Sequence, residues 1–178
     1  MSTDLNAVHR RFHELATAYS PEEERPLGGF VGLASVYVGA IGGVSLLARA
    51  RGRSLPDRIS PADLALLTVA THKLSRILAK DAVTSPLRAP FTSFAGNSGE
   101  GEVMEEVRGT GWQHSVGELL TCPFCLGVWV ATGFAAGGVL APRATRTAAT
   151  VLTAVFGSDL LHLLYDSAKQ LPQRAQPD

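Results

Sequence analysis

Three long stretches without charged side chains constrain this chain most strongly. They are residues 27–48, 119–142 and 147–165, and only the last is interrupted, by Asp159 and His162. A soluble domain would mix apolar and polar residues at helical or strand period, whereas here the charges lie mainly between the stretches. Because a helix rises about 1.5 Å per residue and a bilayer core is about 30 Å thick, each stretch is long enough to cross a membrane.

A further helix is predicted at residues 61–80. Ser60 is a good N-cap and Pro61 suits the first helical position. The second half carries a cationic stripe made of His72, Lys73, Arg76 and Lys80. This helix therefore either crosses with its polar face inward or lies at the membrane interface. The expected fold is an all-α integral membrane bundle with three or four transmembrane helices.

The first 26 residues have no signal-peptide pattern and contain a different kind of helix. Its apolar residues recur at spacings of three and four: Leu5, Val8, Phe12, Leu15 and Tyr19. This pattern indicates an amphipathic helix on the membrane surface or against the bundle. We expect an N-terminal amphipathic segment over 1–26, a membrane domain over 27–166, and a flexible tail over 167–178.

Small residues form a stripe along the first long stretch: Gly28, Gly32, Ser35, Gly39 and Gly43. Such stripes let helix backbones approach closely, either within one chain or in a dimer. We favour packing within the chain. Residues 81–116 are expected to be a polar connection, with a mobile glycine- and serine-rich part at 95–101.

Arginine is concentrated in the short loops at 49–60 and 141–146. With four crossings these loops share one side, and the positive-inside tendency places that side in the cytoplasm. The expected location is therefore the cell membrane, with both termini and the 81–116 connection outside. This orientation depends on the 61–80 helix crossing.

The sharpest local motif is Cys122-Pro123-Phe124-Cys125. It lies where a helix should start, and the positive end of a helix dipole favours a cysteine thiolate. Thiol–disulfide exchange is one hypothesis, and a pair of inert thiols is the alternative. A glutaredoxin fold is rejected because no strand precedes the motif. Zinc would need more ligands than two cysteines, and no histidine follows at a ligand spacing, so no metal is expected.

Charged and imidazole side chains within the apolar helices form a second candidate site: His72, Lys73, Arg76, Asp159 and His162. Such groups are costly in a membrane unless they face the bundle or water. They predict either a structural polar clasp between helices, which we favour, or a path for protons or ions.

A third set of candidates is the connecting segment around Asp81 and Arg88, together with Glu118 before the cysteines. Arg88 would either bind a lipid phosphate or a carboxylate, or anchor the loop by capping a helix end. No phosphate-binding loop, dinucleotide motif, zinc-protease helix or nucleophile elbow is present. We therefore expect no cofactor and favour a role that is not enzymatic. With 16 basic and 16 acidic residues, the chain also has no charge signature for nucleic acid.

Three separated motifs resemble a known bacterial family, domain of unknown function 1360. They are residues 71–76 (THKLSR), 81–91 (DAVTSPLRAPF) and 117–129 (GELLTCPFCLGVW). The resemblance extends over about residues 30–166 and implies a small multi-pass membrane protein. Its members include a sporulation-associated membrane protein, and the family implies no catalytic residues or cofactor.

The leading hypothesis is a structural or accessory membrane protein whose partners are the lipid bilayer and a second copy or another membrane protein. The first alternative is a membrane thiol-redox protein that uses Cys122 and Cys125. The second is a small component of an ion- or proton-linked transporter.

Overall fold

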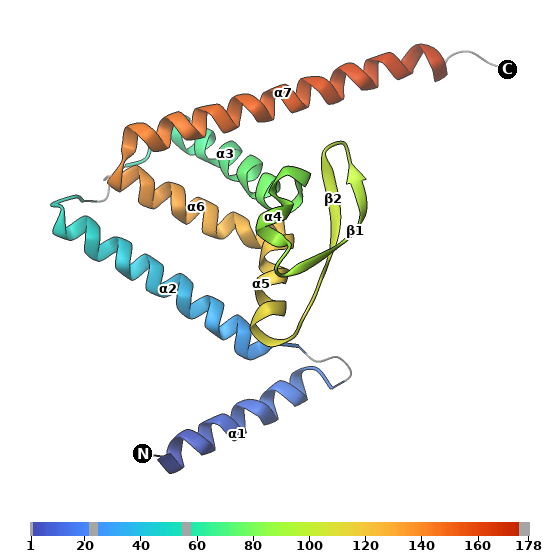
Figure 1. Ribbon diagram of the computed structural model, residues 1–178. Coiled ribbons are helices and arrows are strands. Elements are labelled where there is room, and N and C mark those ends of the chain that lie inside the picture. Colours follow the sequence, from blue (N-terminus) through green and yellow to red (C-terminus); the bar gives the residue numbers. More distant parts are fainter. Residues whose placement is uncertain (1, 22–24, 55–57, 175–178) are drawn as a thin grey trace.

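The computed structural model describes residues 2–21, 25–54 and 58–174, and these are mostly helical (Figure 1). In chain order the elements are α1 (Ser2–Tyr19), α2 (Leu27–Ala50), α3 (Pro61–Lys80), a 3-10 turn (Ala82–Thr84), α4 (Ser85–Arg88), β1 (Thr92–Gly99), β2 (Glu102–Val107), α5 (Gly111–Thr121), α6 (Pro123–Leu140) and α7 (Pro142–Arg174). The predicted helix start at Ser60 is confirmed, because its hydroxyl accepts a hydrogen bond from the Asp63 N–H at 3.0 Å.

The main core lies where α3, α6 and α7 meet. Ala70, Phe134 and Ala149, one from each helix, are buried there. The two alanines let the helices approach closely around the single large ring. Leucine and valine side chains surround this centre: Leu66, Leu67, Leu74, Val130 and Leu152.

α2 lies beside this core and is held mainly at one end. A Cβ added to Gly29 would lie 2.2 Å from the Ser115 hydroxyl, and one added to Gly32 would lie 2.7 Å from the Trp112 ring, so both glycines permit close contact with α5. In contrast, added Cβ atoms at Gly39 and Gly43 meet nothing within 4 Å. The glycine stripe therefore packs within the chain only in its first half.

The all-α expectation was wrong in one place, because the connection contains an antiparallel β-hairpin. Its strands are joined by Glu100 and Gly101, and Gly101 has a φ of +75°, which favours glycine at this turn. The glycine- and serine-rich segment at 95–101, predicted to be mobile, forms most of β1 and the turn. The last residues of the predicted connection, from Gly111 on, form the start of α5.

The helices α2, α3, α6 and α7 all run between the same two ends of the molecule (Figure 1). Arg146 at the start of α7 pairs with Asp63 at the start of α3 (2.5 Å), whereas Arg53 after α2 donates to the Val139 carbonyl near the end of α6 (3.5 Å). We call this the arginine end. The hairpin and α5 lie at the opposite end (Figure 1).

Within the described ranges, three helices are long and apolar enough to cross a membrane: Leu27–Ala50, Pro123–Leu140 and Pro142–Gln170. The buried shares of their most apolar windows are 0%, 17% and 6%, so most of this apolar surface is left uncovered by the chain itself. α3 packs on both α6 and α7 without belonging to this set.

The two terminal segments extend away from the bundle (Figure 1). α1 forms a helix as expected, and Leu15 and Tyr19 on its apolar stripe are exposed, while the side chains of Leu5, Val8 and Phe12 lie outside the described residues. α7 continues to Arg174, through the first part of the tail that we expected to be flexible, and residues 175–178 lie outside the described part.

Candidate functional site

Arg88 is the centre of the most enclosed polar site in the described structure. Its side chain is 0% exposed although α4, which carries it, has only four residues. The carboxylate of Glu105 on β2 neutralises it: the Nε–Oε2 distance is 2.5 Å, and Nη2 donates to Oε1 at 3.3 Å. Glu105 is itself 6% exposed. This fork-shaped pairing is the geometry in which a guanidinium binds a carboxylate most strongly.

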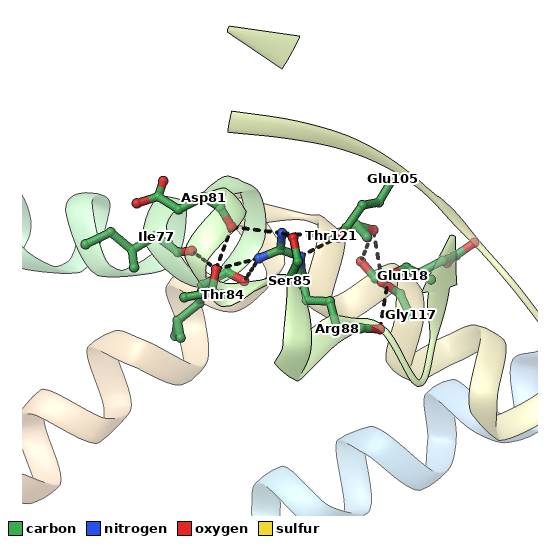
Figure 2. A network of polar contacts seen from close by, with 11 residues as sticks. Ile77, Asp81, Thr84, Ser85, Arg88, Glu105, Gly117, Glu118 and Thr121 are labelled. Atoms are coloured by element: carbon green, nitrogen blue, oxygen red, sulfur yellow. Dashed lines mark hydrogen bonds and ion pairs between the residues drawn. The ribbon is translucent and has the colours of Figure 1, made fainter. Parts of the chain in front are cut away.

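The remaining donors of Arg88 bind the connection between α3 and α4 (Figure 2). Nη1 donates to the Leu78 carbonyl at 2.8 Å and to the Thr84 hydroxyl at 2.6 Å. Nη2 donates to the Asp81 carbonyl at 3.0 Å and to the Ser85 hydroxyl at 3.2 Å. All three guanidinium nitrogens are therefore occupied within the chain.

Arg88 combines parts of both predicted roles, because it binds a carboxylate, that of Glu105, and also the end of a helix. Leu78 and Asp81 lie at the end of α3, where helix carbonyls lack partners within the helix. Arg88 therefore anchors the loop by capping a helix end, with no donor left over for a lipid phosphate. Asp81 contributes through its backbone carbonyl, which the sequence could not indicate.

A second ion pair fixes the tip of the hairpin. Arg76, which we had grouped with the intramembrane cluster, instead binds Glu102 through both Nε and Nη2, at 3.0 and 2.7 Å. The Asp81–Glu102 bridge lies beside it. The hairpin is thus attached to α3 through Arg76 and to α4 through Arg88.

Glu118 of α5 has a different set of partners. Its carboxylate pairs with Arg25 just before α2, at 2.8 Å, and lies 3.1 Å from His114 Nε2. The His114 Nδ1 lies 3.3 Å from the Gly109 carbonyl. Glu118 therefore ties α5 to the start of α2, and it does not contact Arg88 directly.

Cys122 and Cys125 form a disulfide at the junction of α5 and α6. Cys122 is the N-cap of α6, and its sulfur accepts the Cys125 N–H at 3.2 Å. The extended backbone at Cys122 ends α5, and α6 begins at Pro123, which confirms the predicted helix start at this motif. Cys122 is half-buried and Cys125 is exposed, and Phe124 between them is 90% exposed.

The intramembrane cluster is only partly assembled. Lys73 of α3 pairs with Asp159 of α7 at 2.7 Å, and the His72 ring packs edge-on against Phe156, with ring centres 5.4 Å apart. His162 is exposed on α7. This arrangement has the geometry of a clasp between α3 and α7.

An apolar groove lies between α2 and α6 towards the arginine end. Its volume is about 640 Å³. At its inner end the Tyr37 hydroxyl hydrogen-bonds the Thr132 hydroxyl at 2.7 Å, and its ring packs edge-on against Trp129. Neither Asp159 nor His162 lines this groove.

Sequence reasoning missed several partners that make these sites. Glu102, Glu105 and Arg25 were not singled out, although each is one half of an ion pair. The excess of glutamates at 100–106 was the available signal, but it did not show which of them would face an arginine. Among the described residues, no three His, Cys, Asp or Glu side chains are grouped as metal ligands.

These features define the class of protein: a small helical chain with three candidate membrane spans, and a hairpin anchored at one end by a buried arginine. The chain belongs to the family described as protein of unknown function (DUF1360), which matches residues 66–165. That match includes α3 from Leu66 onward, the hairpin, both cysteines and α6, and it excludes α1 and α2.

The chain is also similar to the sporulation protein YjcA of Bacillus subtilis (strain 168). The two are 37% identical over 71 residues, which cover 38% of this chain and 60% of the relative. The chain thus spans less than two thirds of that protein. No solved structure matches the chain.

Proposed function

We propose that this chain is an accessory protein of the cell membrane that acts by packing its helices against a second copy or another membrane protein. The observation that carries this proposal is the uncovered second half of α2. None of its most apolar window is buried by the chain, and Gly39 and Gly43 face open space. Close approach of small residues is the usual means of association between helices in lipid, where burial of apolar surface gives no driving force.

The proposed orientation places the arginine end in the cytoplasm. α2, α3, α6 and α7 run between the two ends of the molecule. At one of these ends Arg49 lies in the last turn of α2, and Arg51, Arg53 and Arg58 follow the helix. The disulfide lies at the other end, and disulfides persist in oxidising compartments outside the cytoplasm. Charge and disulfide thus support the same orientation, with the hairpin and both termini outside.

The test is self-association in detergent. Gly39→Leu with Gly43→Leu should abolish dimers or partner complexes, measured by cross-linking and by mass in detergent. The matched control is Val38→Leu, because Val38 is 67% exposed and lies about 100° away around the helix. An unchanged complex in the double variant would contradict the proposal, as would a protein that stays dispersed in plain buffer.

A second candidate function is thiol–disulfide exchange, favoured by the exposed Cys125 in the disulfide. A thiolate of a partner dithiol would attack the Cys125 sulfur, and Cys122 would leave as a thiolate. The partner's second thiol would then resolve the mixed disulfide. The partner dithiol is oxidised, and Cys122 and Cys125 are reduced by the same two electrons.

The Cys125 N–H and the start of α6 would stabilise the leaving Cys122 thiolate. The test is trapping with an oxidised partner: in Cys122→Ser the Cys125 thiolate should attack the partner's disulfide, the reverse of the last step, and the mixed disulfide should accumulate because Cys122 is absent to resolve it. Cys125→Ser should accumulate much less. Equal or absent trapping in both variants would contradict exchange. Ion-linked transport stays a prediction with no such support, since Lys73 already pairs with Asp159.

A further inference from the structure

The groove between α2 and α6 has one apolar part and one charged mouth. Its apolar walls come from both helices: Tyr37, Ile41, Val44, Trp129, Ala136 and Val139. Both charged residues that line it are arginines, Arg49 and Arg53, and they lie at the arginine end. The volume of about 640 Å³ falls within the range of about 300–1,000 Å³ that is common for ligand sites.

The groove is bounded by contacts at both ends. Tyr37 and Thr132 join the helices at the inner end, and Arg53 reaches the Val139 carbonyl near the mouth. From Tyr37 to Arg49, α2 rises by about 18 Å, which is slightly more than half of a bilayer core of about 30 Å. The groove is therefore as deep as one leaflet.

We infer that this groove binds one acyl chain of an anionic phospholipid, whose phosphate is held by Arg49 and Arg53. The inference rests on the proposed membrane insertion. In hydrocarbon, an apolar groove of this size must be filled, and lipid chains are the surrounding solvent. Guanidinium groups at the membrane surface favour phosphate, with which they form paired hydrogen bonds.

A second copy of the chain fits this groove less well. In a symmetric dimer within one membrane, both copies place their arginine ends at the same depth. Arg49 and Arg53 would then meet like charges rather than a phosphate. The glycine face used for association also lies elsewhere on α2, because Gly39 and Ile41 are two residues apart and hence about 200° apart around the helix.

The experiment measures lipid binding to the full chain in mild detergent by native mass spectrometry. The probes are phosphatidylglycerol and phosphatidylcholine with identical acyl chains. We expect one tightly bound phosphatidylglycerol per chain, favoured by about fivefold for each arginine. Arg49→Gln with Arg53→Gln should remove that preference. Arg51→Gln is the matched control, because Arg51 is exposed in the same loop and does not line the groove.

A second pair of variants tests the apolar part. Ala136→Phe should displace both lipids, whereas Ala131→Phe, on an exposed part of α6 outside the groove, should displace neither. Equal affinity for the two lipids would overturn the inference. So would a loss of the phosphatidylglycerol preference in Arg51→Gln as large as in the double variant. Loss of a dimer instead of a lipid in Ala136→Phe would also overturn it. Those outcomes would leave the proposed membrane insertion and the Gly39–Gly43 test of self-association unaffected. If the purified protein instead stayed dispersed in plain buffer, both the proposed function and the lipid site would be ruled out.

Discussion

Arg88 and Glu105 form a buried ion pair that joins α4 to β2 across 17 residues of sequence. Their side chains are 0% and 6% exposed, and within the described residues no buried side-chain nitrogen or oxygen lacks a hydrogen-bond partner. Charges removed from water are stable only when paired and fully hydrogen-bonded. The hairpin therefore depends on this pair for its position.

Replacement of Glu105 should loosen the hairpin end. Glu105→Gln leaves the buried guanidinium without a counter-charge, and we expect the free energy of unfolding to fall by about 3 kcal/mol. The measurement is denaturant unfolding in detergent, followed by tryptophan fluorescence. Glu106→Gln is the control, because Glu106 is the adjacent residue on β2 and is exposed. Equal stability of the two variants would contradict the role assigned to Glu105.

Gly117 should be intolerant of any side chain. A Cβ there would lie 2.8 Å from the Phe91 carbonyl and 2.6 Å from a methyl of Val107, and the carbonyl belongs to backbone that cannot move freely. Gly117→Ala should destabilise the protein by about 1–3 kcal/mol. Gly127→Ala, where an added Cβ meets nothing within 4 Å, should be neutral or slightly stabilising. The same unfolding assay compares them, and a reversed order would refute the close contact between α5 and the hairpin.

The Lys73–Asp159 pair should be energetically coupled. Lys73 is 15% exposed and Asp159 is 46% exposed in the chain alone, and lipid would cover the exposed side. A double-mutant cycle with Lys73→Met and Asp159→Asn should give a coupling free energy of about 1–3 kcal/mol. The double variant should lose less free energy of unfolding than the sum of the losses in the two single variants. A coupling near zero would mean that the pair is solvated like an ordinary surface ion pair.

The two cysteines should react at different rates once reduced. Cys125 is exposed, whereas Cys122 is half-buried, so we expect that access decides the order and that iodoacetamide modifies Cys125 first. Mass spectrometry of the labelled peptide over time measures this order. After denaturation the two rates should become similar. If Cys122 reacts first in the folded protein, the proposed direction of attack in thiol exchange is wrong.

The helices could be predicted from the sequence because each is encoded locally. Runs without charge fixed their approximate positions, and Ser60 with Pro61 marked the start of α3. The hairpin could not be predicted in this way. Its register depends on pairs such as Thr92 with Val107, which are distant in sequence, and the glycines of β1 read as a loop.

The candidate sites follow the same division. The motif containing Cys122 and Cys125 was identified because its two sulfurs are close in sequence. The partner of Arg88 was not, because four glutamates lie within residues 100–106 and only the fold selects Glu105. Likewise, Arg76 looked like a member of the intramembrane cluster until the hairpin brought Glu102 to it.

In the proposed orientation, the arginine end and the disulfide end lie on opposite sides of a membrane. The most direct measurement is labelling of intact cells with a membrane-impermeant maleimide. Two single-cysteine variants are compared: Cys122→Ser, which retains Cys125, and Arg51→Cys in a background of Cys122→Ser and Cys125→Ser. We expect Cys125 to be labelled in intact cells and residue 51 to be labelled only after lysis. Labelling of both positions in intact cells, or of neither before lysis, would contradict this orientation.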